Sequence, residues 1–172
     1  MIEVQRTDNS PMSNPAFSSE LRLREVTSDD VEEILFHRRQ MFHDMGHVDA
    51  AVLEAIVRSS RPFVERSLRD GGYHGWFAVT AAGRVAAGAG LLIIPWVSGP
   101  LAPDQAYRAY LLNVYTYPEF RRRGLARRLT AKVIDYCRER GYKLLWLHAS
   151  KYGQSLYESL GFEATNEMKL TL

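Results

Sequence analysis

Pro118-Glu119-Phe120-Arg121-Arg122-Arg123-Gly124-Leu125-Ala126 is the stretch that decides the fold predicted for this chain. Residues 110–117 before it alternate between two apolar-rich faces, as in a strand, and residues 126–137 after it place apolar side chains at helical spacing. Main-chain N–H groups at a helix start attract anions, and glycine lets an anion approach the backbone. Five of the eight residues 121–128 are arginine. The stretch therefore predicts a strand, loop and helix that either bind a phosphorylated ligand or form a solvated basic helix start.

The chain before this stretch predicts a short strand followed by helices. Residues 21–26 have strand character, and Thr27 and Asp30 stand at capping-box spacing ahead of an amphipathic helix. Asp49 is placed to cap a second helix, and Pro62 is expected to begin a further helical turn. The apolar faces of these helices are expected to pack against a sheet.

The remaining segments complete an α/β fold of the α+β type. Residues 76–80 and 85–94 flank a turn and predict a β-hairpin, whereas residues 144–149 predict a strand after the central helix. A short helix is expected at 153–160 and strand material at 163–172. An antiparallel run that passes into one strand–helix–strand crossover implies a mixed sheet with helices on its faces.

Length and composition indicate one globular domain. We expect residues 1–19, rich in Ser, Asn and Pro, to be a flexible arm and residues 20–172 to be the folded domain. Lys and Arg number 22 against 20 Asp and Glu, and this near balance argues against a nucleic-acid partner. The apolar run 86–97 is too short to span a membrane, so no membrane partner is expected. The single cysteine, Cys137, excludes an intramolecular disulfide and fits a cytoplasmic location.

Two segments together resemble the signatures of the GNAT superfamily of acyl-CoA-dependent N-acetyltransferases. Arg121, Gly124 and Ala126 fill the defined positions of the motif [Q/R]-x-x-G-x-[G/A]. Residues 153–162 are similar to the signature A-x-x-L-Y-x-x-x-G-F, with Gly153 in place of its alanine. The resemblance implies the GNAT fold, a mixed and mostly antiparallel sheet of about six to seven strands with helices on both faces.

The resemblance also implies where acetyl-CoA, the cosubstrate, would bind. The CoA pyrophosphate would rest on main-chain N–H groups of the loop, and the pantetheine arm would pair with the preceding strand. Ser150 stands where many members have asparagine, and Tyr157 takes the place of the tyrosine that protonates the departing CoA thiolate. The implied cofactor-binding residues are Val114, Tyr115, Thr116, Arg121, Arg122, Arg123, Gly124, Leu125, Ala126, Ser150 and Gly153.

The acceptor side is less sharply defined by the sequence. The resemblance places the acceptor near the turn after the first helix, where Asp44 is the nearest acid, and beside the strand that contains Asn113. Some relatives carry a glutamate base where this chain has Tyr110. The proton of the amine would pass to a water chain, oriented by Asn113 or Tyr115, or to a side chain. The side-chain candidates are Glu25, His37, His43, Asp44 and His148.

The leading hypothesis is direct transfer of an acetyl group from acetyl-CoA to a primary amine of a small molecule or peptide. Transfer would occur in a ternary complex without an acyl-enzyme, and a homodimer is compatible with the sequence. The alternative is a non-catalytic acyl-CoA-binding sensor or interaction module. No metal site is expected, since Gly46 interrupts the helix between His43 and His47. Cys137 is expected in the core rather than as a nucleophile.

Overall fold

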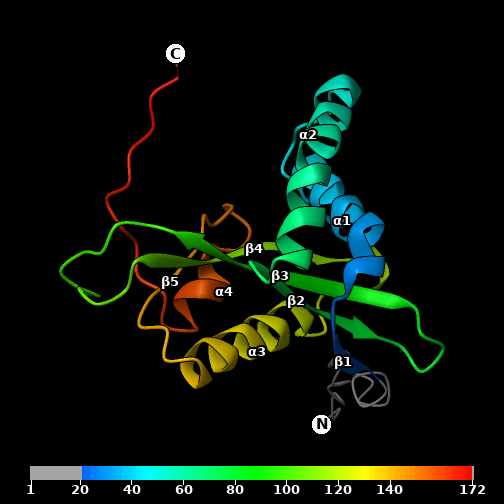
Figure 1. The fold of residues 1–172 in the computed structure, drawn as a ribbon. Coiled ribbons are helices and arrows are strands. Elements are labelled where there is room, and N and C mark those ends of the chain that lie inside the picture. The colour runs from blue at the N-terminus through cyan, green and yellow to red at the C-terminus, as the bar shows by residue number, and fades with distance from the viewer. Residues whose placement is uncertain (1–20, 172) are drawn as a thin grey trace, which may run out of the picture.

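The computed structural model describes residues 21–171, so the expected arm at 1–19 lies outside the described residues. Within them, one five-stranded sheet has the order β1-β2-β3-β4-β5 (Figure 1). Its strands are β1 (Arg22–Glu25), β2 (Tyr73–Val79), β3 (Val85–Pro95), β4 (Tyr107–Thr116) and β5 (Leu145–Trp146). The first four pair antiparallel, and β5 pairs parallel with β4. The predicted mixed, mostly antiparallel sheet is therefore confirmed.

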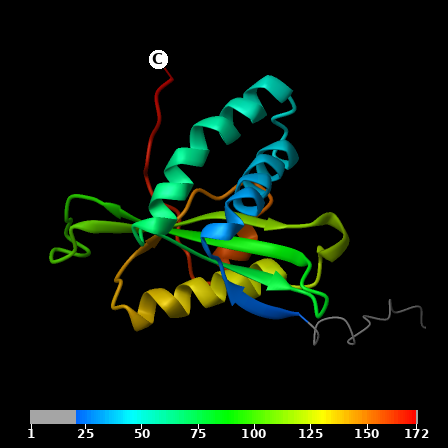
Figure 2. The same ribbon diagram turned by 45° about the vertical axis from the view of Figure 1, so that its right-hand side comes forward.

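Helices cover both faces of this sheet, as predicted. The helices are α1 (Val31–Asp44), α2 (Ala50–Arg69), α3 (Leu125–Glu139) and α4 (Gln154–Glu158). The pair α1 and α2 rises from one face, whereas α3 lies across the other (Figure 2). No helix within residues 21–171 is long and apolar enough to cross a membrane.

The strand count is lower than the predicted six to seven because the C-terminal strand does not form. Residues 163–171 pair with no strand among the described residues. Of the strand predicted at 144–149, only β5, Leu145–Trp146, is present. The side chains of Met168 and Leu170 are 96% and 83% exposed. Without burial of an apolar face, alternating apolar residues gain too little free energy to hold a strand.

The predicted helix starts are confirmed in detail. Asp29 N donates to Thr27 Oγ1 at 3.3 Å and Thr27 N donates to Asp30 Oδ2 at 2.8 Å, which completes the capping box. This box caps a short 3₁₀ helix, Ser28–Asp30, that leads directly into α1, and α1 itself has no side-chain cap. Val52 N donates to Asp49 Oδ1 at 3.1 Å at the start of α2. The separate turn predicted at Pro62 is wrong, because α2 continues through this residue. Proline lacks an N–H group, so α2 loses a hydrogen bond there, whereas Leu53 before it and Val64 after it are buried and hold the helix against the fold.

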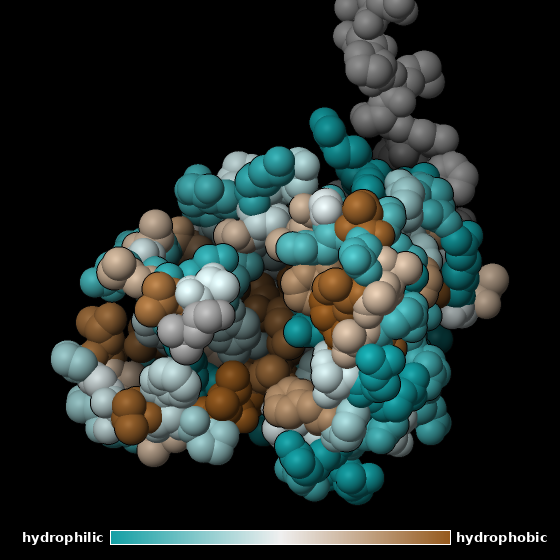
Figure 3. All heavy atoms as spheres, turned by 90° about the horizontal axis from the view of Figure 1, so that it is seen from above, coloured by the Kyte–Doolittle hydropathy of each residue, from teal (hydrophilic) through white to brown (hydrophobic). Residues whose placement is uncertain are grey.

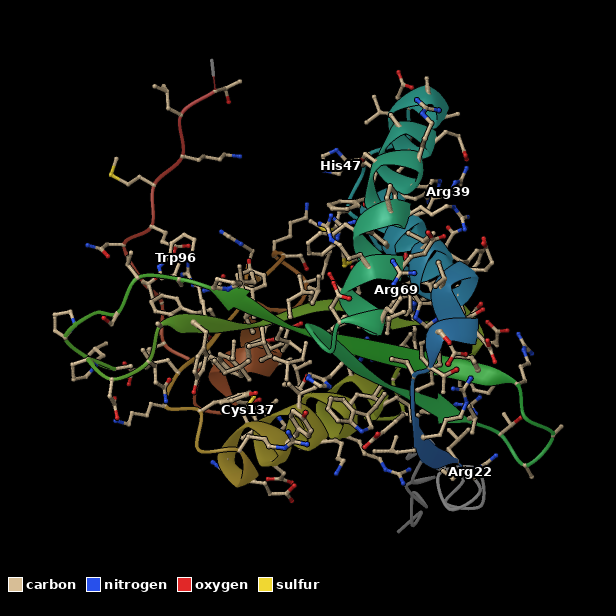
Figure 4. All side chains as sticks on the ribbon, in the orientation of Figure 1. Arg22, Arg39, His47, Arg69, Trp96 and Cys137 are labelled. Carbon is tan, nitrogen blue, oxygen red and sulfur yellow. The ribbon has the colours of Figure 1, made fainter. Side chains whose placement is uncertain are left out.

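The core is divided between the two faces of the sheet. On the α3 face, Leu129 and Val133 pack against Trp76 and Leu91 of the sheet. Cys137 belongs to this cluster on the side of α3 that faces the sheet (Figure 4), and burial raises the pKa of its thiol to about 11. These observations agree with the predicted core position. The other face buries α1 and α2 against β2, β3 and β4.

Close packing at Gly90 of β3 leaves no room for a side chain. A Cβ atom there would lie 2.7 Å from Tyr73 Cζ and nearer still to the hydroxyl of the same ring. We expect Gly90→Ala to lower the free energy of unfolding by about 1–3 kcal/mol, because the buried ring must shift. Urea unfolding measures this loss. Gly72→Ala is the control, since its nearest contact would be an ordinary 3.8 Å and equal losses in both variants would contradict the explanation.

Candidate active site

The loop between β4 and α3 has the backbone geometry of an anion site. Arg122 has φ +61° and Gly124 has φ +73°, both in the left-handed region, so the chain turns sharply into α3. Gly124 caps the helix without a side-chain hydrogen bond, which leaves the N–H groups of the first turn without a side-chain acceptor. A Cβ atom on Gly124 would meet no atom within 4 Å. The space beside Gly124 is therefore free of other described atoms.

Several arginines between residues 121 and 128 bond to other groups of the protein, so they are not all free to bind a ligand. Arg121 Nε donates to Thr116 O at 3.0 Å, and its guanidinium forms an ion pair with Asp44 at the end of α1. Arg123 Nη2 donates to Glu119 O at 2.9 Å, and Arg128 Nη1 donates to Leu21 O at 2.7 Å. These side chains hold the loop in place. An anion at this loop would therefore be held mainly by the backbone, with the net positive charge as a supporting field.

The strand β4 presents a free edge beside this loop. β5 pairs only with Ala109 and Tyr110, so the rest of β4 has no neighbour on that side among the described residues. Tyr117 N donates to Ala86 O of β3. Because successive residues of a strand turn their N–H groups to opposite edges, Val114 and Thr116 direct theirs to the free edge. Tyr115, also predicted as a cofactor contact, directs its backbone to Gly88 of β3 instead.

A bulge in β4 changes the direction of its side chains next to this edge. The register with β3 shifts between Gly88 and Gly90, and Asn113 adopts φ +52°. Asn113 is 4% exposed; its Nδ2 donates to Tyr73 Oη at 3.4 Å, and its Oδ1 accepts from Arg38 Nη1 at 3.1 Å. The predicted substrate residue Asn113 therefore lies in the protein interior, with its amide already hydrogen-bonded on both sides.

A cavity of about 240 Å³ lies over this bulge, on the face covered by α1 and α2. Its lining residues are Arg38, Ser59, Ser60, Phe63, Val64, Tyr73, Leu92, Leu112 and Asn113. Figure 3 views the molecule toward this face. The pair α1 and α2 lies on the right, and the surface is hollowed between this pair and the left half of the molecule, with apolar residues at the floor of the hollow. Sequence reasoning found Asn113 and missed the other eight, because their spacing in the helices and strands is that of ordinary core and surface positions.

The helix α4 places Tyr157 against the α3 side of the core. Gly153 N and Gln154 N donate to Ser150 O at 2.9 and 3.1 Å, which sets the start of α4. A Cβ atom on Gly153 would lie 2.9 Å from Tyr157 Cε2, so glycine in place of the signature alanine leaves room for this ring. Burial raises the pKa of Tyr157 to about 12. Its hydroxyl makes no hydrogen bond to the described residues.

The proposed base residues are dispersed over the molecule. His37 is buried 3.0 Å from Glu33 Oε1, whose oxygen also accepts from the Tyr117 hydroxyl at 2.8 Å. His43 Nδ1 lies 3.6 Å from Asp44 at the end of α1. Glu25 lies in β1, at the far edge of the sheet from β5.

His148 is the base candidate that contacts β4 near the point where β5 ends. Its Nδ1 is hydrogen-bonded to the hydroxyl of Tyr110, the residue that stands where some relatives have a glutamate. Its Nε2 lies 3.6 Å from Glu167 Oε2, so the structure joins three groups that the sequence separates. Within the described residues, no group of three His, Cys, Asp or Glu side chains is placed to hold a metal ion.

Comparison with known proteins gives a consistent result over most of the chain. Residues 31–162 match the acetyltransferase (GNAT) family. A GCN5-related N-acetyltransferase from Ralstonia eutropha JMP134 superposes with a TM-score of 0.84 and 36% identity, over 88% of this chain and 98% of that one. A predicted acetyltransferase with acetyl-CoA from Clostridium acetobutylicum superposes with a TM-score of 0.76 over 88% and 96%, and at 22% identity it shows the fold alone.

Curated relatives match over shorter stretches. The [ribosomal protein bS18]-alanine N-acetyltransferase of Salmonella typhimurium is 46% identical over 61 residues, which are 33% of this chain and 41% of that protein. The uncharacterized N-acetyltransferase YjgM of Escherichia coli is 31% identical over 93 residues, 52% of each chain. The matches thus span about half the length of these relatives or less. Because the family match covers both signatures and most of the sheet, this chain belongs to the GNAT acetyltransferase family.

Proposed function

We propose that this protein is an N-acetyltransferase that moves the acetyl group of acetyl-CoA directly to a primary amine of a small molecule or peptide. The observation that carries the proposal is the combination of the left-handed loop at Arg122 and Gly124 with the adjoining free edge of β4. The first suits a pyrophosphate and the second suits an extended arm with amide groups. Membership of the family supports acetyl-CoA as the ligand that has both parts.

The residues present fit this cosubstrate, which would supply an activated acyl thioester. The open N–H groups of residues 122–126 would hold the pyrophosphate, and the outward groups of Val114 and Thr116 would pair with the pantetheine arm. Ser150 and Gly153 would act indirectly, by setting the start of α4 and leaving room for the ring of Tyr157.

Tyr157 would donate a proton to the departing thiolate. Its pKa of about 12 keeps the hydroxyl protonated at neutral pH, so the proton is present when the thiolate forms. The thiol of CoA has a pKa of ~8.5, judged from that of cysteine, so the transfer needs a hydrogen bond at the sulfur and exclusion of water. The side-chain amide of Asn113 is held by Arg38 and Tyr73 and keeps one N–H donor and one acceptor position with which it would orient a water.

Two measurements on the purified full chain test the proposal. Calorimetric titration with CoA is expected to show one site, and a thiol assay with acetyl-CoA and a panel of primary amines is expected to show amine-dependent release of CoA. Mass spectrometry of the acetylated amine identifies the product. CoA binding without turnover on any amine would favour the acyl-CoA-binding module instead, and absence of CoA binding would contradict both functions.

A further inference from the structure

The side chain of Arg38 has no acidic partner among the described residues. Its Nε donates to Ser60 Oγ at 3.1 Å and its Nη1 donates to Asn113 Oδ1 at 3.1 Å, both neutral acceptors. Its guanidinium also lies 5.1 Å from the centre of the Phe42 ring. By contrast, the next residue, Arg39, pairs with Glu54 at 3.0 Å. Arg38 is thus a partly buried positive charge that no acid in residues 21–171 compensates.

Burial at this position has an electrostatic cost. Loss of solvation lowers the pKa of Arg38, and no carboxylate offsets this effect. Acids on the same helix are already engaged, with Glu33 bonded to His37 and Tyr117, and Asp44 paired with Arg121. Among the described residues no acid is left to pair with Arg38, so a bound anion would supply the missing charge.

The hydrogen-bonding capacity of Arg38 supports the same conclusion. A guanidinium has five N–H donors, and the bonds to Ser60 and Asn113 use two, which leaves three, including both on Nη2. Two donors side by side match the two oxygens of a carboxylate. The Ser60 and Asn113 bonds hold the guanidinium in place from α2 and β4, so little side-chain entropy is lost when an anion binds.

The cavity that Arg38 lines sets the size and character of the ligand. Its volume of about 240 Å³ has room for roughly eight water-sized groups at ~30 Å³ each. Phe63, Leu92 and Leu112 give it apolar lining beside the polar groups. Asn113 in the lining directly precedes Val114, whose N–H group is directed to the free edge of β4 by strand alternation from Tyr117. A molecule in the cavity therefore lies next to the proposed site of the thioester.

We propose that this cavity binds an acceptor that carries a carboxylate as well as the amine, a molecule of amino-acid size with an apolar side chain. Arg38 would bind the carboxylate and the apolar lining would contact the side chain. The amine would then point toward β4. This assignment rests on the proposed acetyl transfer and narrows it to one class of acceptor.

Matched pairs of acids and amides test the assignment. The probes are L-leucine, L-methionine and L-phenylalanine, each compared with its carboxamide, and CoA release is measured for both members. We expect the KM of each acid to be at least about 10-fold lower than that of its amide. The amides have the less basic amino group, with more free amine at neutral pH, so amine ionisation would favour them and cannot produce this preference.

Variants of Arg38 connect the preference to the cavity. Arg38→Gln is expected to remove the preference for the acids, and Arg38→Lys, which keeps the charge but not the paired donors, is expected to retain part of it. Arg39→Gln is the control, because Arg39 lies on the outer side of the same hairpin, next to Glu54 (Figure 4). It should leave the ratio of the two KM values unchanged. Circular dichroism and CoA titration establish that each variant is folded.

The outcomes separate this assignment from the proposed function. If amines are acetylated with equal KM values for acids and amides, the carboxylate assignment is overturned and acetyl transfer still stands. The same conclusion follows if the ratio of the two KM values is unchanged in folded Arg38→Gln and Arg38→Lys. If no amine is acetylated, calorimetric binding of the three acids to the wild-type CoA complex decides the matter. If the acids bind and Arg38→Lys weakens this binding, the cavity assignment is supported. If the acids do not bind, the assignment is overturned.

Discussion

Gly124→Val is expected to reduce CoA affinity by at least about 100-fold, which corresponds to about 2.8 kcal/mol of binding free energy. Gly124 has φ +73°, and a Cβ atom there would meet no protein atom within 4 Å. A valine side chain would therefore occupy the open space that the phosphates need, and its branched Cβ would disfavour the left-handed backbone. Calorimetric titration of the variant with CoA measures the loss.

A matched substitution at the other end of α3 separates ligand exclusion from backbone strain. Gly141 has φ +72°, also with no atom within 4 Å of a Cβ atom. Gly141→Val should therefore lose a similar amount of stability, measured by thermal unfolding, while its CoA affinity stays at the wild-type value. Undiminished affinity in Gly124→Val, or equal loss in both variants, would remove the loop from the cofactor site.

Tyr157→Phe is expected to lower kcat by about 100-fold to 10,000-fold and to leave the Kd for CoA nearly unchanged. Phenylalanine keeps the ring that packs against Phe162, at 5.7 Å between centroids, and removes only the hydroxyl. The loss should therefore appear in the chemical step. Steady-state kinetics with an amine substrate measure it, and Tyr107→Phe, at the start of β4 beside Tyr142, serves as the control. An unaltered kcat in Tyr157→Phe would assign thiolate protonation to solvent.

The pH dependence of the rate follows from the same residue. Burial raises the pKa of Tyr157 to about 12, so the hydroxyl loses its proton only as the pH approaches that value. The rate of the wild-type enzyme should therefore rise with pH as the amine deprotonates, with no decline from Tyr157 below about pH 11. A rate profile up to pH 10 tests this. A decline near pH 8 that disappears in Tyr157→Phe would show that the proton is lost far earlier.

The local sequence determined those structural elements that are stabilised by contacts between residues close together in the chain. The capping residues Thr27 and Asp49, the position of the loop before α3 and the helical pattern up to Cys137 were predictable because each involves contacts within a few residues. The two signatures identified the family for the same reason. The last strand was mispredicted, since residues 163–171 have an alternating pattern but no surface that buries it.

The tertiary structure alone decided which side chains line the cavity beside β4. Arg38 bonds to Ser60, 22 residues away, and to Asn113, 75 residues away, and Asp44 meets Arg121 across 77 residues. In the sequence, Arg38 and Arg39 are adjacent and chemically equivalent. In the fold, Arg38 lines a cavity, whereas Arg39 pairs with Glu54. Periodicity determines which face of a helix is apolar, but the partner of each polar residue depends on how α1, α2 and β4 pack together.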